Sequence, residues 1–373
     1  MRIAIVTHNV IRGDGQGRAN YELARACCAA GHDVTLVASE VDSALLGGEI
    51  RWVRIRPRLF SRVHLFKVKE FTERANSWAR RHAADFDIVH ATGYCLSVPH
   101  QVNTSQFVHA AWLQSPVHTS RLVGGWYGLY HRIYSVCNSR WEQQCYSRAR
   151  AVVAVSNQVR RELEGVGVAA TKLSVIHNGA DLTEFHPGVI DRAALGLPVD
   201  VPLALFAGDI KTPRKNLDTV LKAFAQMSVG HLVVVGRLEG SPFPALAEQL
   251  GIAHRVHFLG FRRDIADLMR AVDLFVFPSR YEACALVLAE ALASGLPVVS
   301  SVATGGAELV TPECGILIEE AADVGALAAA MNKIFGDSPL RKAMSRAARL
   351  RAEGIGWDII TAQYLSLYES LVP

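Results

Sequence analysis

The chain has 373 residues, half of them hydrophobic and a fifth charged, with a formal net charge of +4. This length suits two soluble domains of middling size rather than one, and no apolar run approaches the roughly 20 residues that a membrane span needs. Seven scattered cysteines without a CxxC pair predict buried thiols in a reducing cytosol and argue against a disulfide framework or a zinc site.

The chain begins with a short apolar run, Met1 to Val6, followed by polar residues. This run is too short for the apolar core of a signal peptide, so we expect it to be a first strand. The predicted location is therefore cytoplasmic, or peripheral on the inner face of the plasma membrane.

Short apolar runs alternate with helical patterns in the first half of the chain. The predicted strands are Ile3–Thr7, Val34–Ala38, Trp52–Ile55, Ile88–Ala91, Gln106–His109, Ala151–Val155 and Ser174–Ile176. The clearest helices between them are Gly17–Ala30 and Tyr127–Arg148.

The second half repeats the alternation. Its predicted strands are Leu203–Ala207, Leu232–Val235, Val256–Leu259, Leu274–Phe277, Val298–Ser301 and Gly315–Ile318. Its predicted helices are Asn216–Ala225, Phe243–Leu250, Ile265–Ala271, Leu286–Ala293, Val324–Phe335, Pro339–Glu353 and Trp357–Leu371.

Alternation of this kind predicts an α/β protein with parallel sheets covered on both faces. Because it occurs twice, we expect two Rossmann-like, doubly wound domains that face an interdomain cleft. Loop residues cluster near position 187, which predicts a first domain over 1–186 and a second over 187–356. The last helix, 357–373, is long enough to cross back to the first domain.

Two glutamates stand eight residues apart where a strand passes into a helix. Glu282 follows the strand Leu274–Phe277, and Glu290 lies about one turn into the helix Leu286–Ala293. Ligands of open α/β sheets bind at this end of the strands, and the free N–H groups of a helix start favour a phosphate. Solvated glutamates often show the same spacing, so the pair indicates a ligand site only together with other motifs.

A cationic turn occupies the equivalent position at the start of the second domain. Gly208 ends the strand Leu203–Ala207, and Lys211, Arg214 and Lys215 follow it. Fixed cations can neutralise a diphosphate leaving group without a metal ion. A solvated basic loop is the alternative.

The first turn of the chain is rich in glycine. Gly13, Gly15 and Gly17 follow the first strand, where a backbone without side chains can approach a ligand closely. Their spacing is not the GxGxxG of a dinucleotide site, and Glu40 is the only candidate for its ribose-binding carboxylate. A nicotinamide dehydrogenase is therefore disfavoured, and an ordinary tight turn is the alternative.

Three histidines, His90, His109 and His118, are candidates for a residue at the reaction centre. The sequence pattern alone does not distinguish among them. Asp85 and Asp87 form a D-x-D pair of the kind that can bind a metal. The pair precedes a strand, at the amino end of the sheet, so we do not predict a metal site there.

A basic block lies between Arg51 and Arg81, with ten lysine and arginine residues against two glutamates. Within it Val68, Phe71 and Trp78 share one face of a predicted helix. A basic, aromatic helix can lie on an anionic membrane. Alternatively, this face packs on the domain's own sheet and the arginines are solvated. No nucleic-acid motif accompanies the charge, so we expect no nucleic-acid partner.

Taken together, these residues resemble the family 4 glycosyltransferases, retaining enzymes of the GT-B fold. The run from Pro278 to Val299, which contains Glu282-x7-Glu290, is similar to the family's signature, and Arg214-Lys215 is similar to its phosphate-binding pair. Three more segments resemble family segments, so that the likeness covers nearly the whole chain: Val175 to Pro187, Thr304 to Glu308 and Trp357-Asp358.

The resemblance implies a role for each matching residue. Glu282 would hold the hydroxyls of the donor sugar, and Glu290 would hold the ribose. Arg214 and Lys215 would stabilise the departing diphosphate, with Lys211 as a further cation. The other implied contacts are His109 with the sugar, and Gly15, Gly17, Gly208 and the N–H groups of Ala285, Leu286 and Val287 with the phosphates.

The sequence departs from the family's pattern at two places. Ala283, Cys284 and Ala285 replace the usual Gly-Phe-Gly, which narrows the predicted sugar pocket. Asp209 stands where the family often has an arginine. Both departures concern the identity of the donor more than the reaction.

The resemblance thus implies a retaining, metal-independent glycosyltransferase that needs no cofactor beyond its co-substrate, a UDP- or GDP-linked sugar. The implied acceptor is a glycan or lipid-linked molecule in bacterial cell-surface polysaccharide, lipopolysaccharide or glycolipid synthesis. Two alternatives stay open, a GT-B nucleotide-sugar epimerase and a non-catalytic nucleotide-sugar-binding protein.

Overall fold

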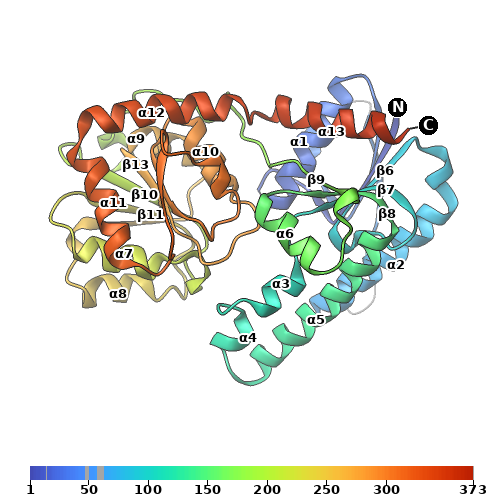
Figure 1. The fold of residues 1–373 in the computed structure, drawn as a ribbon, viewed down its shortest axis with the longest axis horizontal. Coiled ribbons are helices and arrows are strands. Elements are labelled where there is room, and N and C mark those ends of the chain that lie inside the picture. The colour runs from blue at the N-terminus through green and yellow to red at the C-terminus, as the bar shows by residue number, and fades with distance from the viewer. Residues whose placement is uncertain (14, 47–49, 57–62, 373) are drawn as a thin grey trace. The chain divides into compact units, whose positions relative to one another are not determined.

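The structure is a computed structural model that describes residues 1–13, 15–46, 50–56 and 63–372. The chain divides into two compact units (Figure 1). The first unit comprises Met1–Asn178 and Trp357–Pro373, and the second comprises Gly179–Gly356.

The division falls at residue 178 rather than at the predicted 186. Residues 179–186 go with the second unit because they bond to it and fill its core. The Ala180 N–H donates to the Ile355 carbonyl at 3.1 Å, and Phe185 is buried in the second unit's hydrophobic cluster.

A seven-stranded parallel sheet, in the order β5-β3-β1-β6-β7-β8-β9, forms the centre of the first unit. Its strands are β1 (Arg2–Val6), β3 (Asp33–Ala38), β5 (Arg51–Arg54), β6 (Ile88–Thr92), β7 (His100–Ser105), β8 (Ala149–Ala154) and β9 (Leu173–Val175). Two short strands, β2 (Asn9–Val10) and β4 (Glu40–Val41), pair separately. Helices cover both faces of the large sheet, so β1 and β6 are buried along most of their length and read as continuous apolar runs.

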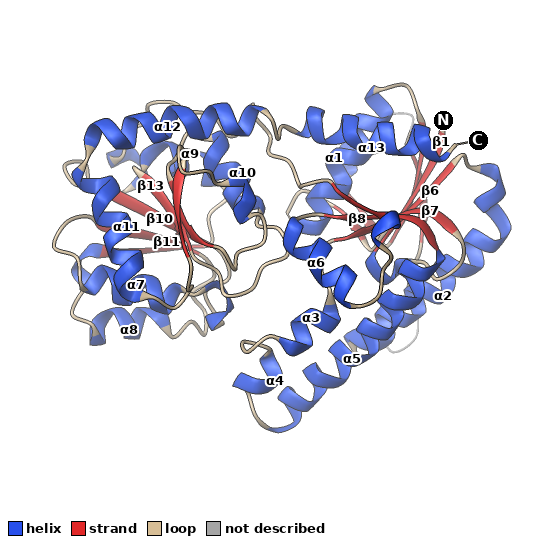
Figure 2. Cartoon of the chain, viewed as in Figure 1, coloured by secondary structure: helices blue, strands red, loops and turns tan. Residues whose placement is uncertain are grey.

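The helices of the first unit lie in two layers. They are α1 (Gly15–Ala29), α2 (His64–His82), α3 (His109–Gln114), α4 (Thr119–Leu122), α5 (Gly125–Arg148), α6 (Asn157–Gly165) and α13 (Trp357–Leu371). Figure 2 shows α1 and α13 on one side of the sheet and α2 and α5 on the other. The C-terminal helix α13 packs against α1 as part of the first unit.

The predicted strand at Gln106–His109 is wrong. The strand is β7, His100–Ser105, and His109 is instead the first residue of α3. Strand β7 was not predicted because most of its residues are polar, so it does not form an apolar run. Asn103, Thr104 and Ser105 are nevertheless buried. Each makes a hydrogen bond inside the unit: the Asn103 amide donates to the Gly93 carbonyl at 2.9 Å, Thr104 Oγ1 lies 2.8 Å from His90 Nε2, and Ser105 Oγ lies 2.8 Å from Tyr146 Oη.

The second unit holds a six-stranded parallel sheet in the order β12-β11-β10-β13-β14-β15. The strands are β10 (Leu203–Ala207), β11 (His231–Val235), β12 (Val256–Gly260), β13 (Leu274–Phe277), β14 (Val298–Ser301) and β15 (Gly315–Ile318). The helices are α7 (Leu217–Ala225), α8 (Phe243–Gln249), α9 (Ile265–Ala271), α10 (Leu286–Ala293), α11 (Val324–Gly336) and α12 (Ser338–Glu353). The strand order reverses between β10 and β13, and the carboxyl ends beside such a reversal are where open α/β sheets bind ligands.

Candidate functional site

The turns after β10 and β13 bring three predicted site residues together. Arg214 and Lys215 lie in a short 3-10 turn, Pro213–Lys215, and Glu282 lies in the loop before α10. Arg214 Nη1 is 3.7 Å from Glu282 Oε2, and Lys215 Nζ contacts the same oxygen. Strands β10 and β13 are hydrogen-bonded neighbours, which is why residues nearly 70 positions apart in the chain meet.

This cluster holds its charges in a partly desolvated place. The side chains of Lys215 and Glu282 are only 13% and 15% exposed, and Lys215 Nζ lies 5.1 Å from the centre of the Phe277 ring. Burial, then the Arg214 guanidinium, lowers the pKa of Lys215 well below its usual value, and the carboxylate of Asp209 opposes this shift. Arg214 and Lys215 are held close together in this place, where an anionic ligand would offset the repulsion between the two cations.

Asn216 fixes the backbone of the cationic turn. Its φ is +68°, the left-handed region, and no other non-glycine residue of the described chain has a positive φ. The side chain is fully buried, and its amide donates to the carbonyls of Pro278 at 2.8 Å and Ala321 at 2.5 Å. Asn216 thereby ties the loop after β10 to the loop after β13.

Arg280 makes a second tie between the same loops. Its guanidinium donates to the Pro213 carbonyl at 2.6 Å and to both carboxylate oxygens of Asp218 at 2.8 and 2.7 Å. Its own N–H donates to the Arg214 carbonyl at 3.0 Å. No role for Asn216, Asp218 or Arg280 was predicted from the sequence. An asparagine directly after the two cations, at the end of a turn, was the available signal for Asn216.

Of the three backbone N–H groups predicted to bind the phosphates, two lie in the first turn of α10. The Ala285 N–H donates to the Gly305 carbonyl at 3.0 Å, so this group is not available to a phosphate as predicted. Leu286 and Val287 form the first turn of α10, which has no side-chain cap, so their N–H groups point outward from the helix start. Glu290 follows one turn later and is half-buried.

Close backbone packing explains the glycine at position 305. A Cβ there would lie 2.1 Å from the Glu282 carbonyl oxygen and 2.2 Å from that of Ala283. Only glycine therefore lets this turn pass behind the Glu282 loop, and the Glu282–Thr304 bridge fixes the contact. The neighbouring Cys284 Sγ lies 3.6 Å from where a Cβ on Gly306 would stand, so the residues that replace the family's Gly-Phe-Gly are part of this packing.

The remaining second-unit residues lie at the edge of the cluster. Gly208 directly follows β10, and a Cβ on it would lie 3.7 Å from Lys215 Cγ. Lys211 is exposed, and its N–H donates to the Asp209 carboxylate at 3.0 Å. The predicted cation Lys211 therefore lies on the surface, whereas Lys215 is largely enclosed.

In the first unit, the glycine turn leads into α1. Gly15 is the first residue of α1 and is exposed, and Gly17, two residues later, is buried. The strand order of this sheet reverses between β1 and β6, and the turn belongs to the loop after β1. Gly15 and Gly17 thus lie at the first unit's own reversal point.

Two of the three candidate histidines have both ring nitrogens engaged. His90 bonds Tyr368 Oη at 2.6 Å and Thr104 Oγ1 at 2.8 Å, and burial lowers its pKa to about 3. His118 bonds Ser120 Oγ at 2.8 Å and Ser135 Oγ at 2.9 Å, and it caps α4. Both therefore have structural roles.

His109 is held differently. Its Nδ1 lies 2.6 Å from Glu142 Oε1, and its backbone N–H donates to Glu142 Oε2 at 2.9 Å. Glu142 is 2% exposed and reaches His109 from α5. With Nδ1 fixed by the carboxylate, Nε2 is the nitrogen left for a substrate. Glu142 was not found by sequence reasoning, because nothing local connects it with a histidine 33 positions away.

The basic block divides into a structural part and a part outside the described residues. Val68, Phe71 and Ala75 on α2 are buried in the first unit's core, and Trp78 packs against that core. This outcome matches the alternative of a face packed on its own domain, so the predicted apolar face of α2 is covered by the core. Leu59, Phe60 and their basic neighbours Arg58 and Arg62 lie outside the described residues.

The D-x-D pair has a structural partner. Asp87 accepts the Arg2 N–H at 2.6 Å and pairs with the Arg2 guanidinium at 3.5 Å. Within the described ranges, no group of three His, Cys, Asp or Glu residues is arranged to hold a metal ion. Nor does any helix of those ranges combine the length and apolarity needed to cross a membrane.

Comparison with known families accounts for both halves of the chain. A model described as "Glycosyltransferase Family 4" matches residues 13–184, and one described as "Glycosyl transferases group 1" matches residues 190–351. The chain therefore belongs to the family 4 glycosyltransferases, and its two Rossmann-like units are those of the GT-B fold.

Among curated sequences, the chain is similar to the D-inositol 3-phosphate glycosyltransferase of Mycobacterium tuberculosis (strain ATCC 25618 / H37Rv). The two are 35% identical over 246 residues, which are 62% of this chain and 51% of the relative. The chain thus spans about half the length of the curated relatives it matches.

Solved structures share the fold over the whole chain. Sucrose-phosphate synthase from Thermosynechococcus elongatus is 23% identical, with a TM-score of 0.78 and 100% and 99% of the two chains covered. WaaG, a glycosyltransferase involved in lipopolysaccharide biosynthesis, is 21% identical, with a TM-score of 0.77 and 99% of each covered. Anabaena HepE, solved in complex with UDP-glucose, is 20% identical, with a TM-score of 0.74 and both chains fully covered.

Proposed function

We propose that this protein is a retaining glycosyltransferase. It moves a sugar from a UDP- or GDP-linked donor to a glycan or lipid-linked acceptor in the synthesis of a bacterial cell-surface polysaccharide, lipopolysaccharide or glycolipid. The donor binds in the second unit and the acceptor in the first. HepE, a structural neighbour with bound UDP-glucose, makes the UDP-linked donor the first one to test.

The cluster of Arg214, Lys215 and Glu282 carries this proposal. Two cations and a carboxylate lie together beside the strand reversal between β10 and β13. A donor has the matching chemistry, because its diphosphate is anionic and its sugar offers hydroxyl groups. Glu282 contacts Lys215, so donor binding would exchange that contact for phosphate on Lys215 and sugar hydroxyls on Glu282.

The proposed reaction needs no protein nucleophile. The bond from the sugar's anomeric carbon to the diphosphate oxygen breaks while the acceptor oxygen bonds to the same face of that carbon. The acceptor's hydroxyl proton passes to the leaving diphosphate oxygen. Arg214 and Lys215 stabilise the charge that develops on the diphosphate, which is the role a metal ion has in other transferases.

The other residues have supporting roles in this proposal. The N–H groups of Leu286 and Val287, with Gly208 and Lys211, border the phosphates, and Glu290 binds the ribose. His109, held by Glu142, presents Nε2 to the sugar. We further propose that the protein acts in the cytoplasm, with its acceptor reached from the inner face of the membrane.

A thermal-shift screen of UDP, GDP, ADP and their sugars tests the donor class, because a bound ligand raises the melting temperature by mass action. We expect a shift with one diphosphate series, and its loss in Lys215→Ala but not in Lys222→Ala, an exposed lysine on α7. An absence of any shift in the wild-type protein would contradict the proposal.

Incubation with the donor alone separates the proposed enzyme from its rivals. A transferase leaves the donor sugar's configuration unchanged and at most hydrolyses it slowly. An epimerase would convert the donor without any acceptor, and a non-catalytic binding protein would return it intact even when a competent acceptor is supplied.

A further inference from the structure

Exposed apolar side chains gather at one place in the first unit. Sixteen large hydrophobic residues are exposed in the part of the chain that the structure describes, and six of them fall within positions 122–133. The six are Leu122, Val123, Trp126, Tyr127, Leu129 and Ile133. Trp126 is 86% exposed, the largest fraction for an aromatic residue among them. A concentration of this kind marks an interaction surface.

These residues form one face of what we call the α4–α5 tip, residues 119–136. Trp126, Leu129 and Ile133 are spaced three and four positions apart on α5, so they lie along one stripe of the helix. The stripe faces solvent, in contrast to the apolar face of α2, which the core covers.

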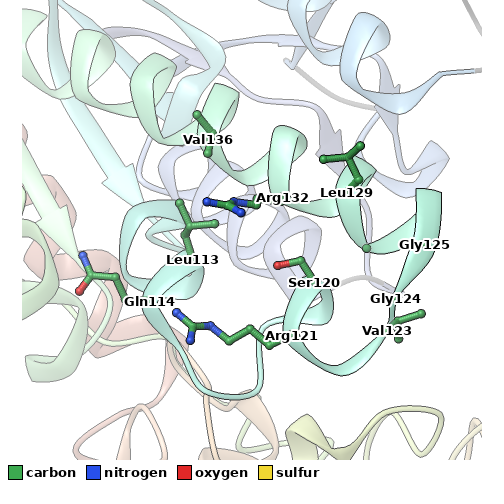
Figure 3. Close-up of a pocket in the computed structure, with 11 residues that line it drawn as sticks. Leu113, Gln114, Ser120, Arg121, Val123, Gly124, Gly125, Leu129, Arg132 and Val136 are labelled. Atoms are coloured by element: carbon green, nitrogen blue, oxygen red, sulfur yellow. The ribbon is translucent and has the colours of Figure 1, made fainter.

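A hollow of about 670 Å³ opens in the tip between α3, α4 and α5. Its described lining includes Arg121 and Arg132 but no acidic residue, and positions 115–136 contain no aspartate or glutamate. In Figure 3 the guanidinium groups of Arg121 and Arg132 extend in the same direction, and Gln114 lies at the margin of the hollow. Two arginines without a carboxylate form a place for an anion.

The hollow is built into the local fold. A Cβ on Gly128 would lie 2.0 Å from the Val123 carbonyl oxygen, so glycine alone lets α5 approach the end of α4 so closely. Gly125 has a φ of +70°, which glycine adopts readily. His118 adds a third constraint, because it caps α4 and bonds Ser135 on α5.

We propose that the α4–α5 tip docks this protein on an anionic phospholipid bilayer. Arg121 and Arg132 hold the phosphate of one lipid headgroup in the hollow, while Trp126, Leu129 and Ile133 enter the interfacial region. Tryptophan and tyrosine favour that region, and arginines favour anionic headgroups. The tip offers no carboxylate for the basic groups of a protein partner, which favours the bilayer as occupant.

Vesicle co-sedimentation at low salt, without donor or acceptor, tests this directly. The wild-type protein should bind phosphatidylcholine vesicles that contain phosphatidylglycerol, and bind pure phosphatidylcholine much more weakly. Each arginine at an anionic surface contributes about fivefold to the partition, so the double variant Arg121→Gln/Arg132→Gln should bind about 25-fold more weakly.

A charge-matched control distinguishes the tip from the basic block. Arg80→Gln/Arg81→Gln removes two exposed arginines from the last turn of α2 and should change vesicle binding less than about twofold. Equal losses in the two double variants would overturn the proposal, because they would reflect net charge alone. Circular dichroism of each variant checks that it has folded.

Tryptophan fluorescence supplies an independent readout. Vesicles should shift the wild-type emission to the blue, and Trp126→Phe should remove most of that shift while vesicle binding is retained. An unchanged shift in Trp126→Phe would overturn insertion of the tip. Displacement of the vesicles by soluble glycerol phosphate would show a free-phosphate site and would overturn the bilayer as occupant. Nucleotide binding in the second unit is measured separately, so failure here leaves the proposed function standing.

Discussion

Asn216 stabilises the cationic turn in two ways, through its left-handed backbone conformation and through its side-chain hydrogen bonds. Substitutions can separate these two effects. Asparagine tolerates the left-handed φ of +68° better than alanine, so Asn216→Ala adds a backbone cost of up to about 1–2 kcal/mol, and it also removes both amide hydrogen bonds. Asn216→Gly relieves only the backbone strain. We therefore expect both variants to be less stable in urea than the wild type, with alanine the worse of the two. Equal stability of Asn216→Ala and wild type would contradict the account.

Nucleotide affinity gives a second measure of the same pair of variants. Because the lost amide bonds free the loop that carries Arg214 and Lys215, both variants should bind the diphosphate more weakly. Glycine should not restore the affinity, although it restores part of the stability. An affinity that follows stability alone would point to general unfolding instead.

Glu142 is expected to act through His109. Glu142→Gln keeps the shape but removes the carboxylate that fixes Nδ1, so the neutral ring can protonate either nitrogen. We expect turnover to fall by about tenfold, equivalent to about 1.4 kcal/mol, with a smaller change in donor affinity. Imidazole ¹⁵N NMR should show mainly the Nδ1-protonated form in the wild type and a mixture in Glu142→Gln. An unchanged tautomer with lost activity would assign Glu142 a purely structural role.

The sequence predicted the charged residues of the candidate site but not the residues that hold them in place. Glu282, Arg214 and Lys215 were found because each follows a recognisable apolar strand. Their supports, Asn216 and Arg280, act through contacts with residues about 60 or more positions away in the chain, and no local pattern encodes such contacts. The Ala285 N–H was assigned to a phosphate because a helix start was visible, whereas its bond to Gly305 was not.

At the scale of elements, the α4–α5 turn depends on one glycine. Gly128→Ala should push α4 away from α5, because its Cβ would meet the Val123 carbonyl at 2.0 Å. Such overpacking costs about 1–3 kcal/mol. Gly165→Ala is a matched control, since Gly165 ends α6 with nothing within 4 Å of an added Cβ. Thermal unfolding should show a lower melting temperature for Gly128→Ala and an equal or higher one for Gly165→Ala.

Most elements were predictable because their patterns are strong. The six strands of the second sheet are short apolar runs, and the structure has each of them within one residue of its predicted bounds. Strand β7 was missed because several of its buried residues are polar, so the segment is not an apolar run. For α2, the spacing of Val68, Phe71 and Ala75 predicted an apolar face but left open what covers it, and the covering core is known only from the tertiary fold.

For the whole molecule, the first unit should be the more sensitive to acid. Burial lowers the pKa of His8 to about 4, of His90 to about 3 and of His100 to about 4, all in the first unit. These rings stay neutral in the folded state, while the unfolded chain takes up protons below about pH 6.5. The stability they contribute is thus fully present above pH 6.5 and falls as the pH drops towards 3.

Hydrogen exchange of the strand amides, corrected for intrinsic rates, can measure the loss of stability in the first and second units separately between pH 7 and 5. One such ring contributes up to about 1.4 kcal/mol per pH unit in this range. His90→Gln should therefore make the pH dependence of the first unit shallower by about that amount, although it destabilises the unit at pH 7. An unchanged slope would show that His90 does not titrate on unfolding as described.

The proposed function depends on a nucleotide-diphosphate site at Lys215. Isothermal titration with UDP and GDP, on the wild type, Lys215→Ala and Lys222→Ala, tests it most directly. We predict that one of the two nucleotides binds to the wild type and to Lys222→Ala with equal affinity, and at least about tenfold more weakly to Lys215→Ala. Wild-type affinity in Lys215→Ala, or no binding of either nucleotide to the wild type, would contradict the account.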